Sequence, residues 1–232
     1  MPTLPIIGPE ALEFYRTAPS SIVTDALTRF GVGAWMDDVL PLDPAWRVSG
    51  RVRTLQYGTK SGMKLSRHSI YSFCDEMEPG DVMVIGTGGT RGWLLGENTI
   101  HYCLNRGIGG VVTDGKVRDV RELLEIPLPV FSRGPTARPF LSEVEVVAVD
   151  VPVEYGGAYV RPGDFIVGDL DGIVLAPNEA AEPLIAEAAE LQVLEKEQEI
   201  AIRERQSLAI VQDVSRRKKL RKGPAFNPKP RG

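Results

Sequence analysis

The chain has 232 residues, long enough to bury a sizeable hydrophobic core in one large domain or two small ones. Its two cysteines, Cys74 and Cys103, are too few for a disulfide framework and neither lies in a CxxC motif, which favours a reduced, cytoplasmic compartment. The two histidines, His68 and His101, argue against a histidine-rich metal site and a Ser-His-Asp triad. Carboxylates and arginines are therefore the expected carriers of any chemistry.

The formal net charge of −4 is unevenly distributed along the chain. Residues 214–232 contain eight basic and no acidic side chains, which leaves 19 basic and 31 acidic residues in 1–213, a net of −12. We expect 1–213 to form a single domain and 214–232 a basic, flexible tail, with nucleic-acid binding by the tail the less favoured alternative. No apolar run reaches the roughly 18 residues of a membrane span, and no export signal is recognisable at the N-terminus.

The first two thirds of the chain predict an α/β fold. Residues 9–31 are typical of one or two short helices, the second capped by Ser20 or Ser21. Alternating apolar residues predict a half-buried strand over 46–57, and a short helical segment follows over 66–78. Apolar runs that end at glycines then predict alternating strands and helices, in the order β-α-β-α-β, across 81–134.

The last third changes from this rhythm to strands joined by turns. From Val144 to Pro177 the runs have no helix between them, and turn signals make them a β-meander. A long charged helix is predicted from 178 to about 213, with Asn178 as its N-cap and Pro183 in its early turns. Its apolar stripe favours packing on a neighbouring subunit, and hence an oligomer.

The first candidate site loop is rich in glycine and follows a predicted strand. It runs from Gly86 to Gly92 and continues to a predicted helix start, where the amides of Asn98 and Thr99 could attract an anion. The spacing fits neither GxGxxG nor Walker A, so a small carboxylate suits the loop better than a nucleotide phosphate. The alternative is a glycine-rich turn in which Glu97 complements the helix dipole.

The second candidate loop runs from Thr113 to Asp119 and follows the next predicted strand, so both loops are expected at the carboxyl edge of one sheet. Arg118 offers a planar fork for a carboxylate or an enolate oxygen, and Asp119 is a hard oxygen ligand for magnesium or manganese. The alternative is an arginine–aspartate surface pair that caps the next helix.

Motifs in and around these loops resemble the RraA-like family, in order from about residue 20 to 205. This family contains the class II 4-hydroxy-4-methyl-2-oxoglutarate/4-carboxy-4-hydroxy-2-oxoadipate aldolases and the regulator of ribonuclease activity. The resemblance implies a swivelling β/β/α sandwich with a long C-terminal helix, assembled as homotrimers or homohexamers. The motifs that carry it are TDAL (24–27), EPGDVMVI (78–85), GENT (96–99), GIGGVVTDGKVRD (107–119), PLPVFSRGPTARP (127–139) and PVEYGGAYVRPGDFIVGDLDGIVLAP (152–177).

For activity, the resemblance implies a lyase that depends on Mg²⁺ or Mn²⁺ and cleaves a 4-hydroxy-2-oxo diacid to pyruvate and a second oxo acid. Oxaloacetate decarboxylation is an expected side activity. The alternatives are a non-catalytic member that binds and regulates a ribonuclease, and an enzyme of the same fold that acts on a different hydroxy acid. The regulators typically lose the aspartate that corresponds to Asp119, so its presence favours an enzyme. Schiff-base catalysis by Lys116 is the less favoured route, since nothing apolar nearby would lower its pKa.

The resemblance also implies roles for individual residues. Arg118 would bind pyruvate and stabilise the enolate, and Asp119 would ligate the metal directly. Glu97 would act in catalysis and reach the metal through water. Gly96 and the amides after Glu97 would bind the pyruvate carboxylate, but an apolar pair of the aldolases is replaced here by Asn98 and Thr99, which leaves the substrate open.

The C-terminal helix completes this implied site from another subunit. In the family it brings a glutamate, four residues before an arginine, to the metal waters of the neighbouring subunit. Glu199 before Arg203 fits that pattern, although Glu195 and Glu197 lie close by. The active site is therefore expected at a subunit interface.

Overall fold

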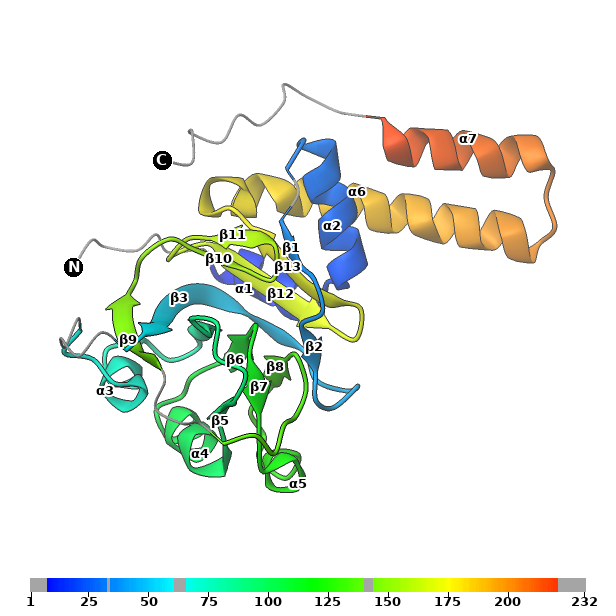
Figure 1. Cartoon of the computed structure of the whole chain (residues 1–232). Helices are drawn as coiled ribbons and strands as arrows, with labels where there is room; N and C mark the ends of the chain where they lie inside the picture. The colour runs from blue at the N-terminus through cyan, green and yellow to red at the C-terminus, as the bar shows by residue number, and fades with distance from the viewer. Residues whose placement is uncertain (1–7, 33, 61–65, 140–143, 221–232) are drawn as a thin grey trace.

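The computed structural model describes residues 8–32, 34–60, 66–139 and 144–220. In this part of the chain, nine strands form one mixed sheet in the order β1-β13-β12-β3-β4-β6-β8-β2, with β9 paired to β3 (Figure 1). Its helices are α1 (Pro9–Thr17), α2 (Ser20–Arg29), α3 (Ile70–Cys74), α4 (Glu97–Asn105), α5 (Val120–Leu123), α6 (Asn178–Arg203) and α7 (Leu208–Lys219). The strands of the large sheet are β1 (Trp35–Met36), β2 (Leu40–Pro41), β3 (Val48–Thr59), β4 (Val82–Gly86), β6 (Gly110–Thr113), β8 (Val130–Ser132), β9 (Val144–Val149), β12 (Phe165–Asp169) and β13 (Gly172–Ala176). Two further pairs lie outside it: β5 (Trp93–Leu95) with β7 (Lys116–Val117), and β10 (Val153–Tyr155) with β11 (Ala158–Val160).

The predicted β-α-β-α-β rhythm is confirmed. β4, β6 and β8 lie parallel, joined through α4 and α5, and β4 also pairs parallel with β3. The two middle strands are fully buried runs, as parallel strands covered on both faces should be. The meander is confirmed in its antiparallel hairpins, but β9 folds back onto the end of β3 instead of pairing with its neighbours in sequence.

Three apolar clusters hold the layers together. One lies between the central strands and the helices α3, α4 and α5, and includes Phe73, Ile85 and Ile100. A second packs α1, α2 and α6 against β12 and β13. The third fills the space between the sheet and the β10–β11 hairpin (Figure 1). The strands thus have helices or a hairpin on both faces, in agreement with the α/β sandwich that the resemblance implied.

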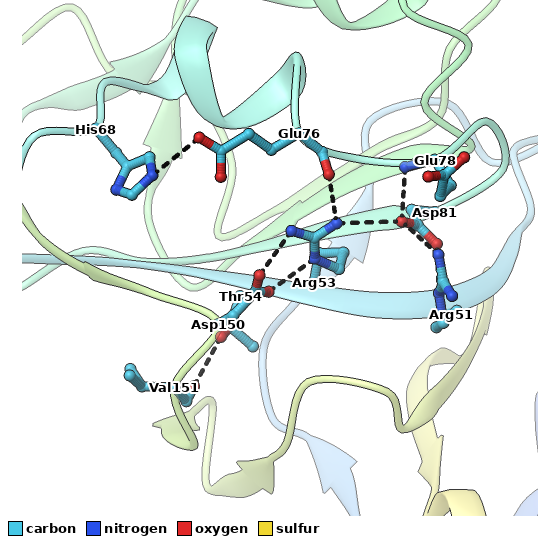
Figure 2. Close-up of polar contacts among 9 residues, drawn as sticks. All are labelled: Arg51, Arg53, Thr54, His68, Glu76, Glu78, Asp81, Asp150 and Val151. Atoms are coloured by element: carbon cyan, nitrogen blue, oxygen red, sulfur yellow. Dashed lines mark hydrogen bonds and ion pairs between the residues drawn. The ribbon is translucent and has the colours of Figure 1, made fainter. Parts of the chain in front are cut away.

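A buried ion cluster fixes the turn that leads into β4 (Figure 2). Arg53 is 4% exposed and binds both oxygens of Asp150, at 2.8 and 2.6 Å. It also donates to the Glu76 carbonyl at 2.9 Å, and Arg51 holds Asp81 through two bonds of 2.7 and 3.0 Å. Because the two arginines and the two aspartates each have an opposite partner, these four charges anchor the turn as a paired set.

Two predicted helix caps are wrong, and for the same reason. The N-cap position of α2 is Pro19, and the Ser20 amide and hydroxyl donate to Asp169 at 2.8 and 2.6 Å. The N-cap position of α6 is Pro177, and the Asn178 amide donates to Asp164 at 3.2 Å. Carboxylates from the end of β12 (Asp169) and from the β11–β12 turn (Asp164) thus satisfy the first amides of α2 and α6, so no local capping side chain is needed.

Replacing Asp169 with asparagine is expected to lower the free energy of unfolding by about 1 kcal/mol at neutral pH. Burial alone would raise the pKa of Asp169, but hydrogen bonds from Ser20 and the charge of Arg47 lower it below the usual value of 3.8. A carboxyl with a lowered pKa stabilises the fold above its unfolded-state pKa and loses this contribution as the pH falls through the folded-state pKa. Denaturant unfolding between pH 7 and pH 3 should therefore show the two proteins converging at low pH. Asp171→Asn, on the exposed turn nearby, is the matched control and should change little.

The C-terminal helix is shorter than predicted. α6 ends at Arg203, where Arg205 takes a positive φ of 54°, and α7 then runs back beside α6 as a hairpin (Figure 1). The predicted long helix over 178 to about 213 is thus two helices, and the first residues of the expected basic tail form the last turns of α7. The other basic residues of that tail lie outside the described residues: Arg221, Lys222, Lys229 and Arg231.

Charge pairs explain why α7 is held against the rest of the chain. Arg217 and Lys218 bind Glu197 and Glu195 on α6. The buried Arg29 on α2 donates to the carbonyls of Arg217 and Lys218, which lie in the last turn of α7, where carbonyls have no amide partner four residues later in the helix. None of the helices in the described residues is long and apolar enough to span a membrane.

Candidate functional site

Strands β5 and β7 place the two candidate loops side by side. They pair in parallel, with Trp93 opposite Lys116 and Leu95 opposite Val117. The Arg118 amide donates to the Leu95 carbonyl at 3.0 Å, so the residues that follow each strand emerge next to each other. This juxtaposition agrees with the prediction that both loops lie on one edge of the α/β unit, although a separate strand pair creates it.

Gly96 lies against the second loop so closely that no side chain fits there. A Cβ atom at this position would collide with Asp119 Oδ2 and would stand 3.0 Å from Arg118 Nε. The backbone of Gly96 is extended, with φ −150° and ψ −174°, so any residue could adopt its conformation. Glycine is therefore required by the approach of Asp119 and Arg118, and not by the turn.

Asp119 connects the second loop to the start of α4. Its backbone is left-handed, with φ 57° and ψ 39°, an uncommon conformation for a non-glycine residue. The side chain does not cap α5, although Asp119 stands at its N-cap position, and instead accepts the Glu97 amide at 3.2 Å. The Asp119 carboxylate is therefore directed to the first loop and not to its own helix.

Arg118 is held by an aromatic ring and by its neighbour. Its Cζ atom lies 3.9 Å from the centroid of the Trp93 ring, and its Nε lies 3.2 Å from Asp119 Oδ2. The side chain is 46% exposed, so the guanidinium is ordered but open to a ligand. This arrangement suits a fork that receives a carboxylate.

The first turn of α4 adds amides and hydroxyls to the same place. The amides of Glu97, Asn98 and Thr99 are the first of the helix, which is where an α-helix offers N–H groups to an anion. The Thr99 amide also donates to the Gly96 carbonyl at 3.1 Å, which leaves Asn98 the better donor of the two predicted ones. The Thr99 hydroxyl lies 3.4 Å from that of Tyr71, an exposed residue of α3 that the sequence did not suggest.

Glu97 has its carboxylate near a histidine on the same helix. Glu97 Oε1 lies 3.6 Å from Nε2 of His101, one turn later, and both side chains are about half exposed. Lys116, the less favoured nucleophile, is partly buried and donates to the Arg133 carbonyl at 3.0 Å. The Glu97 backbone is thus beside Asp119, and its carboxylate is open to solvent, as a group that exchanges protons with a substrate must be.

Glu199 lies elsewhere in the chain. It is on α6, paired with Lys196 at 2.8 Å and with Arg203 at 2.6 Å. The hydrogen bond from Lys196 and the charge of Arg203 lower its pKa. α7 engages Glu195 and Glu197, whereas the ion-pair partners of Glu199 in the described residues lie on α6 itself, and one chain does not bring Glu199 to Arg118.

The Asp119 carboxylate is compatible with a hard divalent cation that keeps most of its water. Within residues 8–32, 34–60, 66–139 and 144–220, no group of three or more histidine, cysteine, aspartate or glutamate side chains is placed to hold an ion. Magnesium is commonly bound through one or two carboxylates together with waters and substrate oxygens. The Asp119 carboxylate is about one third exposed and lies beside the Glu97 backbone, which is compatible with that mode.

Sequence comparison identifies the group of proteins to which this arrangement belongs. A profile of the RraA-like family, described as Aldolase/RraA, matches residues 20–175, which include every residue of the two loops. The chain belongs to the RraA-like family. Among its RraA-like relatives, a protein of Halalkalibacterium halodurans is 32% identical over 81% of this chain and 86% of its own length. That relative is provisionally named a 4-hydroxy-4-methyl-2-oxoglutarate aldolase, and a Thermus thermophilus protein of the same name is 34% identical over 57% of this chain and 77% of its own length.

Solved structures agree with this assignment and show the range of the RraA-like family. A Pseudomonas syringae protein superposes with a TM-score of 0.78 at 25% identity, over 90% of this chain and 99% of its own. Streptomyces coelicolor RraAS2, described as an unusual member of the RNase ES inhibitor RraA family, has a TM-score of 0.75 at 28% identity, over 83% of this chain and 96% of its own. RraA-like proteins thus carry both lyase names and the names of ribonuclease inhibitors.

Proposed function

We propose that this RraA-like protein is a divalent-metal-dependent lyase that cleaves a 4-hydroxy-2-oxo diacid to pyruvate and a second oxo acid. The observation that carries the proposal is the convergence of Arg118, Asp119 and the first turn of α4 around Gly96. This convergence offers a fork for a carboxylate, a hard oxygen ligand for a cation and helix amides within one small region.

The chain's own groups then have distinct tasks. Arg118 and the Asn98 amide bind the carboxylate of the pyruvyl end and orient it. When the C3–C4 bond breaks, its electrons move onto the pyruvyl fragment, and Arg118 stabilises the enolate oxygen that results. Glu97, or Glu199 of the partner subunit, receives the proton of the C4 hydroxyl as that carbon becomes a carbonyl. Return of this proton to C3 converts the enolate to pyruvate and restores the glutamate.

A divalent cation held by Asp119 supplies Lewis-acid stabilisation of the negative charge that develops on the 2-oxo acid. The same charge develops when oxaloacetate loses carbon dioxide, so oxaloacetate decarboxylation is the expected side activity.

The substrate is tested with a panel of 4-hydroxy-2-oxo acids and with oxaloacetate, with pyruvate measured by a coupled dehydrogenase. We expect turnover of at least one 4-hydroxy-2-oxo diacid in the presence of Mg²⁺ or Mn²⁺ and a lower rate with oxaloacetate. If the protein turns over only a different hydroxy acid, and does so with a metal ion, then the proposed site residues stand and the proposed substrate class is wrong. Failure to release pyruvate from every compound would reject the lyase.

The complete site is proposed to form in a homotrimer or homohexamer, with Glu199 entering from the partner subunit. Mixing Asp119→Asn subunits with Glu199→Gln subunits should then restore activity, because some interfaces regain both native residues. Each variant alone should be impaired, and Glu195→Gln should behave like the native protein, since Glu195 is paired with Lys218 of its own chain. Mixtures that are no more active than their parents would show that Glu199 does not complete a partner's site.

A ribonuclease-regulating role is the second candidate, and it is favoured by the relatives described as inhibitors. RraAS2 and the Thermus RraA, which has a TM-score of 0.54 at 30% identity over 67% of this chain, are both described by inhibition and not by catalysis. In that case we expect no metal-dependent turnover, and inhibition of ribonuclease E by the purified protein. The retention of Asp119 is the reason to place the lyase first.

A further inference from the structure

We propose that Trp93 is a positioning residue for the candidate site, because it holds the Arg118 guanidinium flat with its terminal nitrogens directed to the substrate carboxylate. The inference rests on the proposed function, since that function makes Arg118 the carboxylate-binding group.

Strand pairing fixes the tryptophan and the arginine relative to each other. Trp93 lies on β5 and Arg118 directly follows β7, and the two strands pair in parallel. The Trp93 amide donates to the Arg138 carbonyl at 3.1 Å, and the Arg118 amide donates to the Leu95 carbonyl at 3.0 Å. Backbone hydrogen bonds therefore fix the main chain at both residues, so the two side chains start from fixed positions when they stack.

The guanidinium is confined on three sides. The Trp93 ring covers one face, with Cζ 3.9 Å from the ring centroid, while Nε points to Asp119 Oδ2 at 3.2 Å. The backbone of Gly96 closes the third side. In the part of the chain that the structure describes, no acceptor is assigned to Nη1 or Nη2 of Arg118. These two nitrogens form the edge of the fork that binds a planar carboxylate with two parallel hydrogen bonds.

Preorganisation explains why an aromatic ring is useful at this point. An arginine side chain that is almost half exposed has many rotamers, and freezing it on binding lowers affinity. A tryptophan face attracts a guanidinium by about 0.5 to 2 kcal/mol, which corresponds to roughly a 2- to 30-fold change in an equilibrium constant. Removal of the ring should therefore weaken carboxylate binding by about tenfold.

The test uses three full-length variants with oxalate, a dianion that resembles the enolate of pyruvate, as the probe. Trp93→Leu removes the aromatic face, Trp93→Phe retains a smaller one, and Trp35→Leu removes a half-exposed tryptophan on β1 as the control. With Mg²⁺ present, calorimetry should give an oxalate Kd about tenfold higher for Trp93→Leu, a value nearer the native one for Trp93→Phe and no change for Trp35→Leu. KM for the cleaved substrate should rise in the same order.

A double-mutant cycle distinguishes positioning from general packing. If Trp93 acts through Arg118, then Trp93→Leu should have little further effect on the oxalate Kd in an Arg118→Lys background. In addition, the Arg118 Nε–H resonance, assigned through Arg118→Lys, should lie upfield in the native protein because of the ring current and move downfield in Trp93→Leu. Additive losses in the cycle, or an Nε–H resonance that Trp93→Leu leaves unchanged, would overturn the inference.

The two hypotheses fail in different ways. A protein that releases no pyruvate but shows the Arg118 shift and a coupled loss of oxalate affinity rejects the lyase and keeps the positioning role. A protein that turns over normally, and in which Trp93→Leu matches Trp35→Leu, keeps the lyase and rejects the positioning role. If the native protein binds no oxalate, the Nε–H resonance decides the inference.

Discussion

Replacing Arg118 with lysine is expected to reduce pyruvate release by about two to three orders of magnitude while the protein remains folded. Lysine keeps the positive charge but offers a single ammonium in place of two parallel donors, and it lacks the planar group that stacks on Trp93. Replacing Asp119 should be at least as damaging, because it is the one carboxylate of the site proposed to bind the cation directly. Both effects are measured as kcat/KM in the coupled pyruvate assay.

The choice of variant matters at Asp119, since its φ of 57° is strained for alanine. Asparagine tolerates the left-handed conformation and keeps an acceptor for the Glu97 amide, so Asp119→Asn removes the charge with the least disturbance. Arg121→Lys, on the exposed side of α5, is the matched control for Arg118→Lys and should retain native activity. Near-native kcat/KM in either Arg118→Lys or Asp119→Asn would remove these residues from the proposed chemistry.

A single methyl group at Gly96 should be almost as harmful. Gly96→Ala places a Cβ against Asp119 Oδ2 and at 3.0 Å from Arg118 Nε, so the two side chains that carry the proposed chemistry must move apart. A displacement of about 1 Å in a positioned group can cost about a hundredfold in rate. Since the extended backbone of Gly96 suits alanine, the loss should appear in kcat/KM and not in the melting temperature.

The control for this experiment is a glycine at another helix N-cap. Gly8→Ala, before α1, brings a Cβ no closer than 3.7 Å to Glu182 and should leave activity unchanged. If Gly96→Ala were as active as Gly8→Ala, then close contact between the two loops would not be needed for function.

Much of the fold was predictable because the signals were local. The runs of apolar residues that became β4 and β6, and the glycines that end them, lie within a few residues of one another, and parallel pairing follows from the helices between them. The caps of α2 and α6 were not predictable, since their acceptors, Asp169 and Asp164, come from distant turns. A helix whose first amides are bound by tertiary contacts carries no capping signal of its own.

The break between α6 and α7 was missed because the usual stop signal is absent. Arg205 occupies the left-handed position after the helix where glycine is the common choice, and the Gln206 amide bonds back to the Ala201 carbonyl at 2.9 Å. The ion pairs between the two helices hold the turn in place. Sequence periodicity continues through such a turn, so it predicts one helix where the chain forms two.

At the candidate site, the sequence indicated which side chains have suitable chemistry, but it did not indicate what holds them. Arg118 and Asp119 were identified from their residue types and their place after a strand. Trp93 was missed because its contact with Arg118 depends on the pairing of β5 with β7, two strands of three and two residues that are too short to show a period. The available signal was an aromatic residue, Trp93, three positions before Gly96 at the start of α4.

The central claim is that the protein cleaves a 2-oxo acid with the help of a divalent cation held at Asp119. The most direct test is pyruvate formation by the native protein from a 4-hydroxy-2-oxo diacid before and after treatment with EDTA, followed by addition of Mg²⁺ or Mn²⁺. The account predicts release that EDTA abolishes and that either ion restores in the native protein but not in Asp119→Asn. Release that persists unchanged in EDTA, or no release with either ion, would contradict it.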